Sequence, residues 1–186
     1  MACFPETPSL LERGKKDAVG DLYCRMEARG ELALAGERVT DVAALLRMGR
    51  AAYGNPDVVV ADRWREGELR QALSQAGIPP AALVIRGQGY RDGGEDVRNF
   101  RKAVVDGRVR MPVSLLMRAA LAGAVTVSDA AGNSKLAKKE DTPDRRDGHR
   151  DDAVAAMILA VGTGYRRFYG ADVESLQPSA GYSIIN

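Results

Sequence analysis

Three aspartates stand where a folded chain can bring carboxylates together. Asp62 directly follows an apolar run at 58–61, three valines and an alanine, and Asp151 and Asp152 open an apolar stretch that begins at Ala153. A strand that is apolar on both faces is typical of a buried parallel sheet, and sites in α/β proteins gather where such strands end. Carboxylate oxygens are the ligands that Mg²⁺ prefers. These three aspartates are therefore the candidate metal ligands, with Asp62 and Asp151 as the candidate catalytic pair.

The chemistry expected of such a pair is metal-assisted hydrolysis. Two ions about 3.5–4 Å apart activate water and stabilise the leaving oxygen when a phosphodiester is cut. Simpler roles remain open for each residue. Asp151 and Asp152 can cap a helix, which is worth about 0.5–2 kcal/mol and explains one aspartate better than two. Asp62 can pair with Arg63 or Arg86, and Asp129 can add a third carboxylate or, more simply, shape a turn.

Basic residues are unevenly placed in a chain whose formal net charge is only +2. Between Arg86 and Arg110 there are seven basic and four acidic residues. A local basic surface near candidate metal ligands favours a polyanionic partner. For any single residue, a solvated helix face or loop charge is the alternative. The candidate DNA contacts are Arg63, Arg86, Arg91, Arg98, Arg101, Lys135, Lys138 and Lys139.

The elements that position these residues follow from periodicity. A strand at 57–62, a helix from Trp64 to Ala76 and a strand from Ala82 to Ile85 predict a βαβ unit with parallel strands. Trp64 is expected in the core, although it and Tyr90 can also stack on bases. The other predicted elements are a broken helix over 5–29, a strand at 31–35, helices at 40–53, 95–106, 114–122 and 151–167, and a hairpin of 124–128 with 134–137.

Composition narrows the class of protein. The chain has 186 residues, 45% apolar and 28% charged, which is ordinary for one globular domain. No apolar run approaches the roughly 20 residues that span a bilayer, and no signal peptide is recognisable. One histidine makes a zinc site improbable, and two lone cysteines indicate reduced thiols. No phosphate loop or nucleophile–base pair is found, which argues against a small-molecule enzyme.

Four stretches together resemble a known family. The residues at 58–73 (VVVADRWREGELRQAL), 86–104 (RGQGYRDGGEDVRNFRKAV), 132–139 (GNSKLAKK) and 149–162 (HRDDAVAAMILAVG) are similar to the nuclease domain of the large terminase subunit of tailed bacteriophages, prophages and gene transfer agents. Their order and spacing make the resemblance specific, although each motif alone is weak. It covers roughly residues 4–166.

The resemblance implies a ribonuclease H-like α/β fold, with a mixed sheet flanked by helices. It also implies an Mg²⁺- or Mn²⁺-dependent endonuclease, with two metal ions, that cuts concatemeric double-stranded DNA. The family's strand-end and helix-start acidic residues fall on Asp62 and Asp151. Implied partners are DNA, an ATPase domain or subunit, a small terminase subunit and a portal, in the cytoplasm of the bacterial host.

The same resemblance implies a difference from complete nucleases of this kind. These carry a further aspartate on an opening strand, and this chain resembles the family from just after that strand. We therefore expect an N-terminally truncated domain over 1–170, followed by a tail at 171–186, without the ATPase. The alternative function is a catalytically impaired remnant that only binds DNA or docks.

Overall fold

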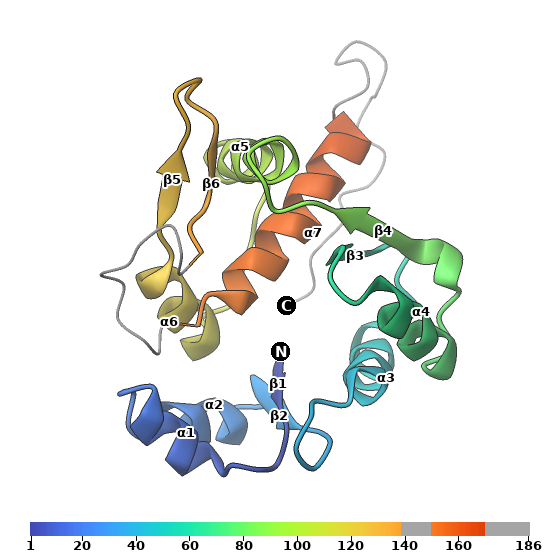
Figure 1. Ribbon diagram of the computed structural model, residues 1–186, viewed down its shortest axis with the longest axis vertical. Coiled ribbons are helices and arrows are strands. Elements are labelled where there is room, and N and C mark those ends of the chain that lie inside the picture. The colour runs from blue at the N-terminus through green and yellow to red at the C-terminus, as the bar shows by residue number, and fades with distance from the viewer. Residues whose placement is uncertain (139–149, 170–186) are drawn as a thin grey trace.

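The computed structural model describes residues 1–138 and 150–169, and its fold is α/β (Figure 1). The predicted tail, Lys139 and the loop up to His149 lie outside the described residues. The strands are β1 (Ala2–Phe4), β2 (Leu32–Leu34), β3 (Val59–Asp62), β4 (Leu83–Arg86), β5 (Thr126–Ser128) and β6 (Ser134–Leu136). The helices are α1 (Leu10–Lys16), α2 (Leu22–Ala28), α3 (Val42–Tyr53), α4 (Glu66–Gln75), the 3-10 turn η1 (Pro80–Ala82), α5 (Asp92–Val105), α6 (Leu115–Gly123) and α7 (Asp152–Tyr169).

The βαβ unit around β3 and β4 is confirmed. The two strands are parallel, with Val59 opposite Leu83 and Asp62 opposite Arg86. Helix α4 covers them through a small apolar core of Leu73, Ala76, Ile78 and Leu83. The expectation that β3 is buried on both faces is wrong, because all four of its residues are only half-buried. Among the described strands β3 has one neighbour, so one edge of it is not covered by the sheet.

The strands pair two by two in the described part of the chain. β1 and β2 are parallel, β3 and β4 are parallel, and β5 and β6 form the predicted antiparallel hairpin. The single mixed sheet of the predicted fold is therefore not continuous here. Strands of three or four residues form only short ladders, so helices must hold the pairs together.

Helix α7 is the core helix that the sequence predicts. Figure 1 shows it running beside α5 and past β3, and it also contacts α6. Val154 and Ile158 of α7 pack with Val97 of α5 and Ala120 of α6. The two long helices approach closely at Gly162, where an added Cβ would lie 2.8 Å from the Cα of Asp96. None of the helices in ranges 1–138 and 150–169 is long and apolar enough to cross a membrane.

The N-terminal layer differs most from the prediction. β1 was not predicted, and the helix expected over 5–29 is split into α1 and α2 at Asp17 to Asp21, where Ala18 and Gly20 have positive φ. Helix α3 is capped by Asp41, whose side chain accepts from the N–H of Ala44. Cys3 and Cys24 are both free thiols.

Candidate active site and nucleic-acid surface

Asp62 is the last residue of β3, half-buried at the carboxyl end of the strand. Within 1–138 and 150–169 its carboxylate has no hydrogen bond or ion pair, so the expected alternative of pairing with Arg63 or Arg86 is not seen. A carboxylate that is partly desolvated and without a partner can be stabilised by a bound cation. The metal-ligand role of Asp62 stays a prediction.

The connection from β3 to α4 is short and exposed. Arg63, Trp64 and Arg65 form it, and all three are exposed. Trp64 is 75% exposed, so its expected place in the core is wrong. Arg65 adopts a left-handed φ of 62° and pairs with Glu68 one turn into α4. The left-handed residue turns the chain sharply from strand into helix and leaves the indole outside the packed unit.

Arg86 lies opposite Asp62 in the β3–β4 ladder, but its side chain bonds to Asp96 and Glu95 of α5 instead. Its Nε donates to Oδ2 of Asp96 at 3.0 Å, and its Nη2 donates to Oδ1 of Asp96 and to Oε2 of Glu95, both at 2.9 Å. Arg166 of α7 donates to the same Glu95 oxygen at 2.9 Å. The Arg86 side chain is 11% exposed and that of Asp96 is fully buried. This geometry disfavours the predicted DNA contact for Arg86, because its donors already bind α5.

The electrostatics of this cluster follow from burial and pairing. Burial raises the pKa of Asp96, and the hydrogen bonds from Arg86 offset only part of that rise. Burial also acts to raise the pKa of Glu95, but the bonds from Arg86 and Arg166 outweigh it and lower the pKa. The cluster joins β4, α5 and α7, so it positions the strand ends around Asp62.

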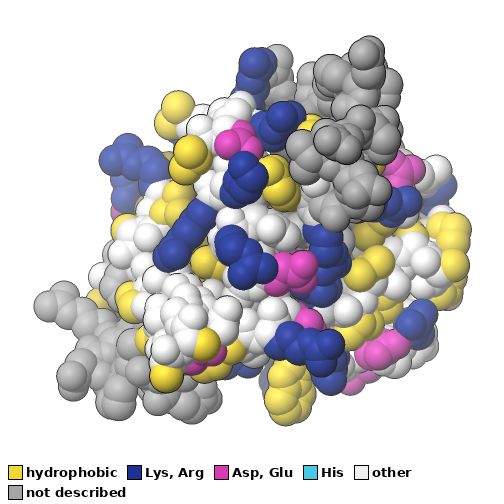
Figure 2. All heavy atoms as spheres, turned by 90° about the horizontal axis from the view of Figure 1, so that it is seen from above, with side chains coloured by type: hydrophobic (Ala, Val, Ile, Leu, Met, Phe, Trp, Pro, Cys, Tyr) yellow, Lys and Arg dark blue, Asp and Glu magenta, His cyan; other side chains and the backbone are white. Residues whose placement is uncertain are grey.

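The basic residues of α5 and the hairpin share one side of the molecule. Arg91, Arg98 and Arg101 are exposed, whereas Asp96 and Val97 of α5 are buried. Figure 2 shows Lys and Arg side chains gathered on the face seen from above Figure 1, over α5, the hairpin and the far end of α7. We call Arg91, Arg98, Arg101 and Lys135 the basic face.

The hairpin is fastened to this face. Arg101 donates to Oγ1 of Thr126 at 3.2 Å, and Nζ of Lys135 lies 5.1 Å from the ring centroid of Tyr90, in the loop after β4. Lys135 is therefore brought beside the strand-end loop, as its predicted role requires. Lys138 is exposed at the base of the hairpin, and Lys139 lies outside the described residues.

The predicted helix-start aspartates lie at the beginning of α7. Asp151 is half-buried and Asp152 is exposed, and the carbonyl of Asp151 accepts from Ala155 at 2.8 Å. The helix begins beside α6 and passes β3 farther along (Figure 1). No group of three or more His, Cys, Asp or Glu side chains in the described ranges is placed to hold a metal ion. The grouping of Asp62 with Asp151 and Asp152 therefore stays a prediction.

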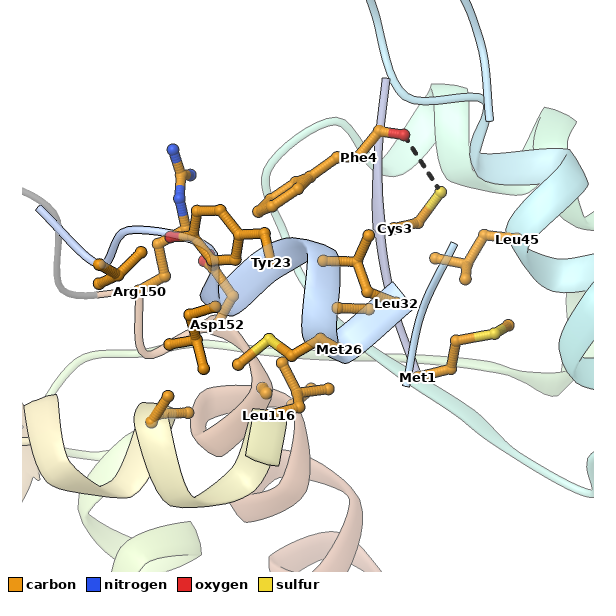
Figure 3. Close-up of a pocket in the computed structure, with 17 residues that line it drawn as sticks. Met1, Cys3, Phe4, Tyr23, Met26, Leu32, Leu45, Leu116, Arg150 and Asp152 are labelled. Carbon is orange, nitrogen blue, oxygen red and sulfur yellow. Dashed lines mark hydrogen bonds between the residues drawn. The ribbon is translucent and has the colours of Figure 1, made fainter. Parts of the chain in front are cut away.

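The start of α7 instead borders an apolar cavity of about 320 Å³ (Figure 3). Arg150 and Asp152 lie at its polar end, and Met26, Leu32 and Leu116 line the remainder. Sequence reasoning missed this region, because nothing in the local pattern marks its members as neighbours.

A buried carboxylate holds Arg150 there. Nε of Arg150 donates to Oδ2 of Asp17 at 2.7 Å, and the hydroxyl of Tyr23 donates to the same oxygen at 2.7 Å. Burial acts to raise the pKa of Asp17, but these two donors outweigh it and the pKa is lowered. Burial, and then the bond to Asp17, raise the pKa of Tyr23 to about 12.

Asp129 serves the turn of the hairpin. Its Oδ1 accepts from the N–H groups of Ala131 and Asn133, at 3.0 and 2.8 Å, and its Oδ2 accepts from the Asn133 amide at 3.0 Å. These bonds lower the pKa of Asp129. The turn role expected of Asp129 is confirmed by these bonds.

Comparison with known proteins identifies relatives from one phage. The chain is 36% identical over 101 residues to the large terminase subunit of Enterobacteria phage HK97, which covers 54% of this chain and 19% of that protein. The crystal structure of the HK97 large terminase matches 87% of this chain and 32% of that chain, with a TM-score of 0.72 and 28% identity. No family profile matches the chain. The resemblance to a large terminase is therefore confirmed as homology, and the chain spans about a third or less of these relatives. That the shared part is the nuclease domain stays a prediction.

Proposed function

We propose that this chain supplies the divalent-metal-dependent DNA endonuclease of a phage packaging terminase, which cuts concatemeric double-stranded DNA. Homology to the HK97 large terminase supports the terminase role. The observation that carries the nuclease role is the state of Asp62, a half-buried carboxylate at a strand end without a partner among the described residues. Among the described residues no side chain offsets this charge, and a bound cation would do so.

The residues present fit such an ion in their chemistry. Mg²⁺ is commonly held by one or two carboxylates, with waters and substrate phosphate completing its shell. In this proposal Asp62 and Asp151 are the protein ligands and Asp152 is a neighbouring acid. The ion, when bound, supplies an activated water for phosphodiester hydrolysis. The chain's own task is to hold the phosphate there, through Arg63, Lys138 and the basic face, which give a sequence-independent grip on the DNA backbone. An ATPase, a small terminase subunit and a portal are the partners proposed from the same homology.

A plasmid-nicking assay with Mn²⁺ tests the proposal, using wild type and Asp62→Asn. Asp57→Asn is the matched control, because Asp57 is exposed and precedes the same strand at its other end. We expect nicking by wild type and by the control, and loss of nicking in Asp62→Asn with DNA binding retained. Nicking by Asp62→Asn at the wild-type rate would refute the assignment.

The second candidate is a catalytically impaired module that binds DNA or docks. It is favoured by the lack of a three-carboxylate group within the described ranges. In that case wild type binds DNA without cutting it, and Asp62→Asn changes neither property. The same assay, run beside a filter-binding measurement, therefore separates the two functions.

A further inference from the structure

Trp64 lies on the surface of the molecule rather than in its core. It is the single tryptophan of the chain and is 75% exposed, although tryptophan is on average a highly buried residue. The short connection that carries it leaves the sheet at the end where Asp62 lies. An exposed indole contributes little to folding stability, so this large apolar surface is available to a ligand.

The surroundings of Trp64 define the chemistry of that partner. Two residues of extended chain span at most about 7 Å, so the backbone of Trp64 lies close to that of Asp62. Arg63 lies between them and is exposed, with no ion pair in ranges 1–138 and 150–169. This combination suits nucleic acid, because Arg63 can bind a phosphate and the indole of Trp64 can stack on a base.

We infer that Trp64 stacks on an unpaired nucleobase, so that the proposed centre acts on DNA whose strand is locally unpaired. The inference rests on the proposed function for its DNA substrate. Bases inside an intact duplex are covered on both faces by their neighbours, and an indole reaches a face only where a base is unstacked, at a gap, a bubble or a frayed end. Trp64 therefore selects among DNA structures, whereas the basic face binds the backbone of any of them.

The lone tryptophan also provides the measurement. Its fluorescence is followed while the metal-free chain is titrated with a single-stranded oligonucleotide, a blunt duplex, and the same duplex with an internal bubble. Fluorescence anisotropy of labelled DNA gives the affinities. We expect quenching by the single strand and the bubble but not by the duplex. Trp64→Ala should weaken binding to the single strand and the bubble by about 5- to 150-fold, without changing duplex binding, and Trp64→Phe should restore part of the loss.

Tyr53→Ala is the matched control, because Tyr53 is 65% exposed but lies on the approach to the amino end of β3. It should change neither affinity. The inference is overturned if all three DNAs quench the fluorescence equally, or if Trp64→Ala weakens binding to all three equally. It is also overturned if the chain binds none of them. So does a concentration-dependent blue shift without DNA, which would place the indole against a second protein molecule. The binding assay needs no cleavage, so nicking can fail while the selectivity holds, or the reverse.

Discussion

Replacing Arg86 with methionine tests whether this residue supports the fold or binds DNA. The Arg86 side chain is 11% exposed and gives two hydrogen bonds to Asp96, which is fully buried. Removing it leaves a buried carboxylate without those donors, a change that costs about 3–5 kcal/mol. Little solvent screening applies to the Asp96 bonds because both side chains are buried. The Glu95 side chain is one-third exposed and remains paired with Arg166, so losing its bond to Arg86 adds little to the loss of stability.

Urea unfolding followed by far-ultraviolet circular dichroism is the appropriate measurement, since the exposed Trp64 reports poorly on unfolding. With a slope of about 2 kcal/mol per molar urea, the midpoint should fall by about 1.5–2.5 M. Adding Asp96→Asn removes the stranded charge and leaves an unpaired amide, so the double variant should lose only about 1–3 kcal/mol. Arg98→Met is the exposed control and should leave the midpoint unchanged.

The reasoning is refuted if Arg86→Met lies within about 1 kcal/mol of wild type, which is the range of an exposed pair. It is also refuted if Arg86→Met weakens DNA binding while stability holds, since that would restore Arg86 as a DNA contact. A double variant no better than the single one would show that Asp96 is not the residue left uncompensated.

Three further outcomes are expected. Arg98→Ala should weaken duplex binding alike for all sequences and reduce the slope of log affinity against log salt by about 1, as measured by anisotropy from low to high salt. Gly162→Ala should destabilise the chain by about 1–3 kcal/mol in urea unfolding, because its Cβ meets α5 backbone at 2.8 Å, whereas Gly164→Ala, with nothing within 4 Å, should be neutral or stabilising. Because folding lowers the pKa of Asp17, its ionised carboxylate stabilises the fold above the ordinary aspartate pKa, near 4. This stabilisation is lost as the pH falls through the lower pKa of the folded state. The free energy of unfolding of Asp17→Asn should therefore depend less on pH in acid than that of wild type.

Local patterns predicted the elements near the candidate site well. The apolar run before Asp62 and the apolar spacing of the next helix are properties of neighbouring residues, and the resulting parallel pair β3–β4 is confirmed. The hairpin and the core helix α7 are confirmed for the same reason. β1 escaped prediction because three residues carry little pattern, and its pairing is with a strand some thirty residues later.

Side-chain environments were predicted less well, because they depend on residues distant in sequence. Arg86 is largely buried because it pairs with Asp96, and Asp96 is itself buried where α5 packs against Gly162 of α7. Trp64 was expected in the core because it follows an apolar strand, yet the left-handed turn at Arg65 leaves it outside. The hydrophobic periodicity of the sequence predicts neither the burial of Arg86 nor the exposure of Trp64.

β3 is four residues long and hydrogen-bonded to β4 alone among the described strands. The backbone of β3 is therefore hydrogen-bonded to another described strand along one edge only. We expect local opening of β3 to cost less free energy than local unfolding of α5 and α7, which pack closely against each other. Deuterium uptake by the amides of Val60 and Asp62 should be rapid in the free chain and slow once DNA is bound. We therefore expect a ligand bound at the end of β3 to make this segment more rigid.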